Sequence, residues 1–251
     1  MMRLWSGILF LCFSGQALAA PLDDLKQALE RLSHPVAGEY QVHAQVVESN
    51  GKGDDKITRK GEAQVRVSDS GERLSIVHSA ELLAQIDAEE QARIDNTDVP
   101  TPAIDGVHEL SALPVRAAVR AAEQMRRVMA EGEFTGAHSD QLDGREVQRL
   151  DFNLPQSRLS KRQRKYVKSY EGVYSVWIDE QGVPLASSSR IDASGRIFIF
   201  ISLHVETESQ RRYQVIDNKL IAVSDRYYHL SYGAGERFER EIKRRVTAAV
   251  P

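Results

Sequence analysis

The second half of the chain consists of β-rich segments separated by short turn sequences. Alternating apolar and polar residues, or runs of β-branched and aromatic residues, predict strands, and two-residue turns between them predict antiparallel hairpins. The turn sequences are Asp143-Gly144, Gln181-Gly182, Ser194-Gly195 and Asp217-Asn218. The strands expected around them are 133–141, 145–154, 172–179, 183–191, 196–206, 209–216 and 219–232. So many hairpin-linked strands constrain the chain to form a large antiparallel sheet.

A helix and a further group of strands precede these hairpins. Leucines recur at helical spacing between residues 22 and 32, and Pro35 ends the helix that they predict. From Tyr40 onward the period changes to two, and polar turns at 50–56 and 69–71 divide the alternating segment into three strands. We therefore expect an N-terminal helix followed by a three-stranded antiparallel meander.

The middle of the chain is predicted to be helical. Ser79 is the expected N-cap of a helix that continues to about Asn96. The proline-containing stretch 98–106 predicts a loop. Ser111 begins the most regular amphipathic helix, and Gly132 stands where its C-terminal left-handed residue is expected.

A final short helix is predicted over 236–246, because Phe238, Ile242 and Val246 share one side at helical spacing. The order of elements is then helix, strands, helices, strands, helix. This order is typical of a single α+β domain. We expect a large curved antiparallel sheet, a half-barrel, with helices packed across its concave face.

The first nineteen residues have the pattern of a secretory signal peptide. Arg3 supplies a positive charge, residues 4–13 form an apolar core, and Ala17-Leu18-Ala19 is a small-x-small cleavage site. The apolar run is too short to span a bilayer. We expect cleavage after Ala19, which leaves residues 20–251 as one exported domain, soluble in the periplasm. The only cysteine, Cys12, lies in the signal, so no disulfide is expected.

Charge and motif content argue against several functional classes. The chain has 33 basic and 36 acidic residues, so it lacks the excess of positive charge that nucleic-acid binding requires. The motifs HExxH, GxSxG and GxGxxG and the Walker loop are absent from the sequence. His204 and Glu206 share a strand face, but a metal site needs three or four ligands. We expect no catalytic residue, no metal and no cofactor. An enzyme without a recognisable motif is the remaining alternative.

One predicted strand is apolar on both of its faces. Its residues are Ile197, Phe198, Ile199, Phe200, Ile201 and Leu203. Because a strand with one solvated face should alternate, both faces are expected to contact apolar groups. Either helices bury the strand on both sides, or one face lines a cavity for an apolar ligand. Trp177 is expected on a neighbouring strand. The candidate ligand-binding residues are therefore Trp177, Phe198 and Phe200.

The stretch 158–168 concentrates positive charge between two predicted strands. Its six basic residues are Arg158, Lys161, Arg162, Arg164, Lys165 and Lys168. An exposed loop of this kind is either a solvated run of charge or a patch for an anionic partner. Such a partner would be an anionic membrane surface, lipopolysaccharide or an acidic envelope protein. Each Lys or Arg near an anionic membrane contributes about 1 kcal/mol to binding.

The order of elements resembles the fold of the lipoprotein-carrier proteins of the Gram-negative periplasm. The resemblance rests on the N-terminal helix, the meander, the helices near 80–130 and several strand sequences. These strand sequences are Val147-Gln148-Arg149-Leu150-Asp151-Phe152, Val176-Trp177-Ile178-Asp179 and Gly182-Val183-Pro184-Leu185. The resemblance implies a curved half-barrel covered by helices, with a cavity between them that takes up acyl chains. We assign no functional residue of that family to a position in this chain.

The sequence therefore leads to two hypotheses. The first is a periplasmic, non-enzymatic carrier that binds a lipid, a lipoprotein acyl chain or another apolar ligand. The alternative is a cell-envelope interaction or assembly module that docks a partner protein through the basic loop or a sheet edge.

Overall fold

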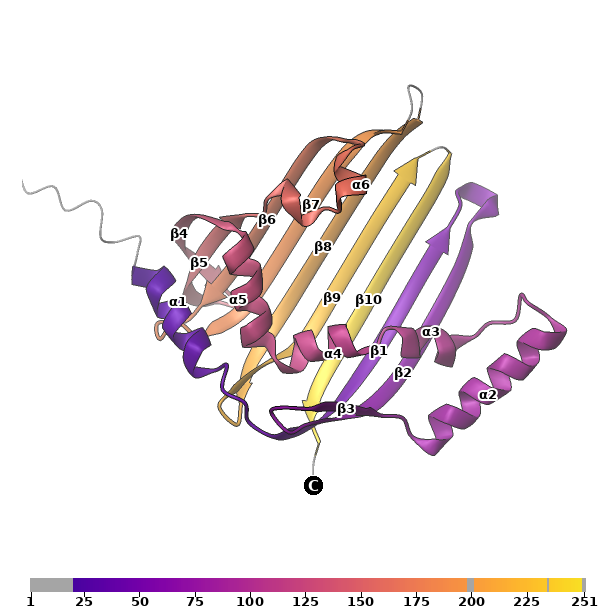
Figure 1. Ribbon diagram of the computed structural model, residues 1–251, viewed down its shortest axis with the longest axis horizontal. Helices are drawn as coiled ribbons and strands as arrows, with labels where there is room; N and C mark the ends of the chain where they lie inside the picture. The colour runs from indigo at the N-terminus through magenta and orange to yellow at the C-terminus, as the bar shows by residue number, and fades with distance from the viewer. Residues whose placement is uncertain (1–19, 198–200, 234, 250–251) are drawn as a thin grey trace, which may run out of the picture.

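The computed structural model describes residues 20–197, 201–233 and 235–249, and these residues contain ten strands in one open antiparallel sheet (Figure 1). The strands are β1 (Gly38–Asn50), β2 (Ile57–Asp69), β3 (Leu74–Val77), β4 (Glu133–Leu142), β5 (Arg145–Asn153), β6 (Val167–Ile178), β7 (Pro184–Ile197), β8 (Ile201–Ile216), β9 (Lys219–Gly233) and β10 (Glu236–Ala248). Their order is β3-β2-β1-β10-β9-β8-β7-β6-β5-β4. Because β10 pairs with β1, the N-terminal meander and the later hairpins form a single sheet. The predicted fold class, an α+β half-barrel, is confirmed.

The helices lie across one face of this sheet, as Figure 1 shows. They are α1 (Ala20–Arg31), α2 (Ala80–Asp95), α3 (Pro102–His108), α4 (Ala112–Val119), α5 (Ala121–Glu131) and the one-turn α6 (Lys161–Arg164). Two 3-10 turns, η1 (Gly53–Asp55) and η2 (Gln156–Arg158), complete the described helical elements. α1, α5, α4 and α3 follow one another across the strands, and α2 lies beyond the β2 side of the sheet. The predicted α1 and α2 are confirmed, including the N-cap Ser79, whose hydroxyl accepts a hydrogen bond from the Leu82 N–H.

The apolar core fills the space between the sheet and these helices. Leu25, Val119 and Met125 from α1, α4 and α5 are almost fully buried against strand residues such as Val42 and Val176. Burial of each such side chain contributes about 1.5–3 kcal/mol. Ion pairs cover the opposite face, for example between Arg190 and Glu206 and between Arg226 and Glu241. The helix-covered face of the sheet is therefore mainly apolar, and the opposite face carries exposed charges.

The C-terminal segment is strand β10, and the predicted helix over 236–246 was wrong. A spacing of four residues, as between Phe238, Ile242 and Val246, fits a strand as well as a helix, because every second residue of a strand shares a face. Arg240 and Arg244 lie between them on the same face. Arg244 is buried on this face. An arginine usually indicates a solvent-exposed position, so the sequence does not show that this face is buried.

The predicted loop 98–106 was also wrong in part, because α3 begins at Pro102. Proline is well tolerated in the first turn of a helix, where its missing N–H would have no partner. α3 packs directly on β2, since a Cβ atom at Gly106 would lie 2.3 Å from the carbonyl carbon of Glu62. Two glycines, Gly106 and Gly61, permit this close approach.

The helix predicted from Ser111 is interrupted at Arg120. Its backbone (φ −125°, ψ 53°) is not helical, and it separates α4 from α5. Gly132 ends α5 with φ −91°, so the left-handed conformation predicted for it is not adopted. The interruption at Arg120 directs its guanidinium towards a buried carboxylate, which is described below.

Three of the four predicted hairpin turns are found at their positions, although Gln181-Gly182 lies in the longer connection 179–183, and the fourth is not found. Asp143, Asp217 and Asn218 have positive φ, as do Gly144 and Gly182. At Ser194-Gly195, however, β7 continues to Ile197, and β8 is one strand from Ile201 to Ile216. Ile197 at the end of β7 pairs with Ile201 at the start of β8. The segment that was expected to be one strand with two apolar faces is therefore divided between β7 and β8. Phe198 and Phe200 lie outside the described residues.

Candidate functional site

A pocket of about 380 Å³ opens between α1, α5 and the sheet end formed by β4 and β5. It is called the α1–α5 pocket below. Its lining residues are Leu22, Lys26, Leu29, Glu30, Arg126, Met129, Ala130, Gly132, Phe134 and Phe152. Its volume lies within the range of small-molecule sites in proteins. The space between helices and sheet is thus not completely filled at this end of the molecule.

The floor of the α1–α5 pocket is aromatic. Phe134 and Phe152 are cross-strand partners in β4 and β5, with ring centroids 5.5 Å apart in a tilted arrangement. Phe152 also contacts the Tyr174 ring, at a centroid distance of 6.1 Å. Gly132 keeps this region open, since a Cβ atom there would lie 3.3 Å from the Phe152 Cβ. The floor can therefore accept an apolar group, which would pack against ring faces and edges.

The rim of the α1–α5 pocket is polar. Lys26 and Glu30 reach it from α1, and Arg126 reaches it from α5. Lys26 also lies 3.3 Å from the Asp23 carboxylate one turn earlier in α1. An apolar floor with charged groups at the rim suits an amphiphile, with its chain inside and its polar end in water.

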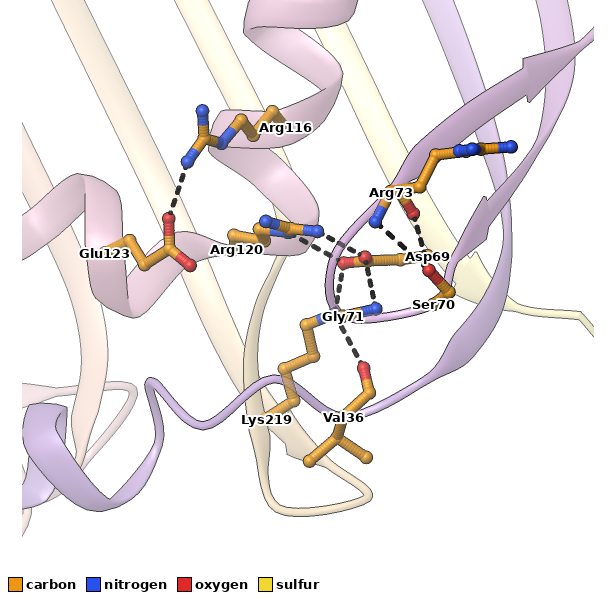
Figure 2. Close-up of polar contacts among 9 residues, drawn as sticks. All are labelled: Val36, Asp69, Ser70, Gly71, Arg73, Arg116, Arg120, Glu123 and Lys219. Carbon is orange, nitrogen blue, oxygen red and sulfur yellow. Dashed lines mark hydrogen bonds and ion pairs between the residues drawn. The ribbon is translucent and has the colours of Figure 1, made fainter.

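Away from this pocket, a buried carboxylate at the end of β2 holds the junction of α4 and α5 on the sheet (Figure 2). Asp69, at the end of β2, accepts hydrogen bonds from Arg120 Nε (3.0 Å), Arg120 Nη2 (2.6 Å) and Lys219 Nζ (2.5 Å). The Gly71 N–H donates a fourth, at 3.0 Å. Lys219 Nζ also donates to the Val36 carbonyl at 3.2 Å. We call Asp69, Arg120 and Lys219 the Asp69 cluster.

The donors of the Asp69 cluster determine the protonation state of its carboxyl group. Burial by itself would raise the pKa of Asp69, whose side chain has no exposed surface. Hydrogen bonds from Arg120, Lys219 and the Gly71 N–H outweigh burial and lower the pKa from 3.8 to about 2. Both carboxylate oxygens of Asp69 are thus engaged by donors of the protein itself. The cluster is suited to holding elements together rather than to binding a ligand.

A second buried network attaches the end of α3 to the sheet. Arg244 donates from Nη1 to Asp225 Oδ2 and from Nη2 to Glu109 Oε2, both at 3.0 Å. Arg240 makes a further ion pair with Glu109, and Arg211 donates to Asp225 at 3.2 Å. Glu109, Asp225 and Arg244 are called the Glu109 cluster. Both clusters lie on the side of the sheet away from the α1–α5 pocket, on strands β2, β9 and β10.

Trp177 lies on the sheet face opposite the helices. It pairs with Arg149 of β5, and its Nε1 donates to Asp140 Oδ2 at 2.9 Å. This hydrogen bond is the main cause of the lowered pKa of Asp140. Asp140 borders a separate polar hollow of about 700 Å³ at the end of β4 and β5, whose other lining residues include Glu146, Asp179 and Glu180. Trp177 is therefore remote from the α1–α5 pocket, and its role in ligand binding stays a prediction.

The six predicted basic residues follow β5 and extend to the start of β6. Arg158 belongs to η2, Lys161, Arg162 and Arg164 form α6, Lys165 follows it, and Lys168 lies in β6. We call residues 158–168 the basic segment. Arg158 Nε lies 3.1 Å from Glu131 Oε2 at the end of α5. The other five are exposed, and within the described residues none of them forms an ion pair. Because Glu131 precedes Gly132, the Arg158 end of the basic segment lies near the α1–α5 pocket.

The residues of the α1–α5 pocket were not predicted as a site from the sequence. The leucine spacing predicted the helix α1, and Phe134 and Phe152 lie in strands that were expected. Their proximity, however, depends on the register of β4 and β5, which includes an irregularity between Phe134 and Gly136. Such irregularities leave no clear signal in an alternating sequence.

No group of three or more His, Cys, Asp or Glu side chains in the described residues is placed to hold a metal ion. Among the helices of residues 20–197, 201–233 and 235–249, none has the length and apolar character needed to cross a membrane.

Known proteins show little similarity to this chain. No protein-family model matches it, and no curated protein is similar to it in sequence. The crystal structure of a DUF1329 family protein from Desulfovibrio piger aligns with 92% of this chain and 93% of its own, with a TM-score of 0.32 and 10% sequence identity. This similarity is a distant structural match.

Proposed function

We propose that the protein is a non-enzymatic periplasmic carrier that binds a lipid, a lipoprotein acyl chain or another apolar ligand in the α1–α5 pocket. The pocket itself is the observation that supports this proposal. It is concave, has an aromatic and aliphatic floor, and has charged groups only at its rim. These are the features of sites that bind amphiphiles.

The expected energetics fit an acyl chain. Each methylene removed from water contributes about 0.8 kcal/mol, so about eight methylenes contribute about 6 kcal/mol before the cost of ordering the chain. A polar headgroup would remain near Lys26 and Arg126, which are both exposed. Neither end of such a ligand would leave a charge buried without a partner.

The contacts of α1 and α5 also suit a carrier, which has to admit and release its ligand. Next to the pocket, these helices contact each other and the sheet through residues such as Leu29, Met129 and Phe152. Apolar contacts have no fixed direction, so they can be exchanged for ligand contacts without leaving a buried polar group unpaired.

A substitution that fills the pocket tests the proposal. Ala130→Trp places an indole in the space available to a ligand, whereas Ala88→Trp makes the same change on an exposed position of α2. We expect the wild-type protein and Ala88→Trp to bind dansyl-labelled undecanoic acid, and Ala130→Trp to bind it at least tenfold more weakly. Fluorescence titration measures the affinity, and circular dichroism checks that both variants fold.

Two outcomes would contradict the proposal. One is a wild-type protein that does not bind the probe and that carries no lipid in native mass spectrometry after purification from the periplasm. The other is equal affinity of Ala130→Trp and Ala88→Trp, which would place the binding site elsewhere.

A further inference from the structure

We propose that the basic segment docks the protein on an anionic phospholipid surface. The distribution of charge along the chain supports this docking. Six of the 33 basic residues and none of the 36 acidic residues lie in the basic segment, so the remainder of the chain has a formal charge of −9. An anionic surface attracts this segment and repels the rest of the molecule, which leaves one favourable orientation.

The cations of the basic segment are available for such a surface. Lys161, Arg162, Arg164, Lys165 and Lys168 are exposed, and within the described residues no acidic side chain neutralises them. Only Arg158 is engaged there, with Glu131. Leu159 and Tyr166, which flank the run, are half-buried. A tyrosine beside lysines and arginines is typical of segments at a membrane interface.

The backbone of the basic segment is held in place on the protein. Ser160 and Gln163 form a capping box: Ser160 Oγ accepts from the Gln163 N–H at 3.2 Å, and Gln163 Oε1 accepts from the Ser160 N–H at 2.9 Å. The Tyr166 carbonyl accepts a hydrogen bond from the Arg196 N–H of β7 at 2.9 Å. The cations therefore project from an ordered platform, and little backbone entropy is lost when they meet a charged surface.

A lipid surface fits this pattern better than an acidic protein does. Four of the cations follow each other around the single turn of α6 and its end, so they present a diffuse charge rather than one paired row. A layer of headgroups is laterally mobile and matches any such arrangement, whereas a folded protein has to place its carboxylates in register.

The position of the basic segment connects docking with ligand binding. The ion pair between Arg158 and Glu131 connects it to the end of α5, next to Gly132 in the α1–α5 pocket. Docking would thus bring the pocket to the source of its ligand. This connection rests on the proposed function, but the docking itself does not.

Vesicle sedimentation tests the docking. We expect the wild-type protein to bind vesicles that contain phosphatidylglycerol at low salt, to be released at high salt, and not to bind phosphatidylcholine vesicles. The fourfold charge reversal Lys161→Glu, Arg162→Glu, Arg164→Glu and Lys165→Glu should weaken partitioning at least about a hundredfold, because each cation is worth about fivefold. A matched control reverses four exposed cations elsewhere, Lys52→Glu, Arg59→Glu, Lys60→Glu and Arg93→Glu, and should retain most of the binding.

Two results would contradict the docking proposal. One is that the wild-type protein does not bind anionic vesicles, and the other is that the basic-segment variant and the control variant lose binding equally. Binding to poly-glutamate without binding to anionic vesicles would instead indicate an acidic protein partner. Affinity for the dansyl-labelled probe in solution separates this result from the proposed function. Reversal of the basic segment should leave that affinity unchanged, whereas failure of the carrier proposal would abolish it in the wild-type protein.

Discussion

The two ends of the helix layer are attached to the sheet by different interactions. On the side of β2, β9 and β10, buried charges in the Asp69 and Glu109 clusters fix the α4–α5 junction and the end of α3. On the side of β4 and β5, α1 and α5 rest on apolar side chains and leave a pocket. Charge pairs require a set geometry, whereas apolar contacts tolerate rearrangement. The difference indicates a helix layer anchored at one end and adaptable at the other.

We expect Lys219→Met to destabilise the anchored end of the helix layer more than any other substitution considered below. It removes one cation from the Asp69 cluster and leaves the carboxylate with less compensation, which costs about 3–5 kcal/mol for a buried pair. Urea unfolding measures the loss. Lys60→Met, at an exposed position, should change the free energy of unfolding by less than about 0.5 kcal/mol. Similar small effects in both variants would show that the cluster does not anchor the helices.

Two methionines of α5 lie in different surroundings, one in the core and one at the pocket. Met125 is 1% exposed in the core, and Met129 lines the α1–α5 pocket. We expect Met125→Ala to cost about 2–5 kcal/mol, because it leaves a cavity, and Met129→Ala to cost about 1 kcal/mol or less. Equal losses in urea unfolding would mean that the pocket end is packed as tightly as the core.

Acid should loosen the anchored end selectively. The pKa of Asp69 is about 2 in the folded protein and 3.8 in the unfolded reference, so the folded state favours the ionised form. The resulting stabilisation, about 2 kcal/mol, is present above pH 3.8 and is lost as the pH falls through about 2. Urea unfolding at a series of pH values measures it. Asp69→Asn should lack this component of the pH dependence, and an unchanged profile in that variant would assign the acid sensitivity to other carboxylates.

The smallest effect is expected where the basic segment meets the pocket end. Glu131 and Arg158 are both partly exposed, so Glu131→Gln should reduce the free energy of unfolding by only about 0.2–1 kcal/mol. The loss should diminish at high salt, because exposed ion pairs are screened. A larger loss, insensitive to salt, would indicate that this ion pair anchors α5 after all.

The periodic parts of the sequence predicted much of this fold. The leucine stripe of α1, the alternation in β1 and the N-cap Ser79 each encode a local conformation that the tertiary structure keeps. The prediction of a helix over 236–246 was wrong because the spacing of Phe238, Ile242 and Val246 fits both the helical and the strand period. The prediction of a loop around Pro102 was wrong because proline, which disrupts the interior of a helix, is also common in its first turn.

The candidate site was less accessible to prediction because it depends on contacts between distant segments. Nothing near Asp69 in the sequence indicates that Arg120 and Lys219 will meet it, since the three come from different elements. The cations of the basic segment were recognised because they are contiguous. Their position beside the pocket follows only from the contact between Arg158 and Glu131.

The pairing of β10 with β1 has a consequence for how the chain is made. Tyr40 pairs with Ala248, with eight strands between them in the sequence, so the sheet cannot join its two halves until almost all of the chain has been synthesised. Contacts at such sequence distance form slowly. Until then β1 and β9 are unpaired edges that can recruit other chains. We expect the newly made protein to depend on a chaperone that shields these edges, and a version truncated before β10 to aggregate.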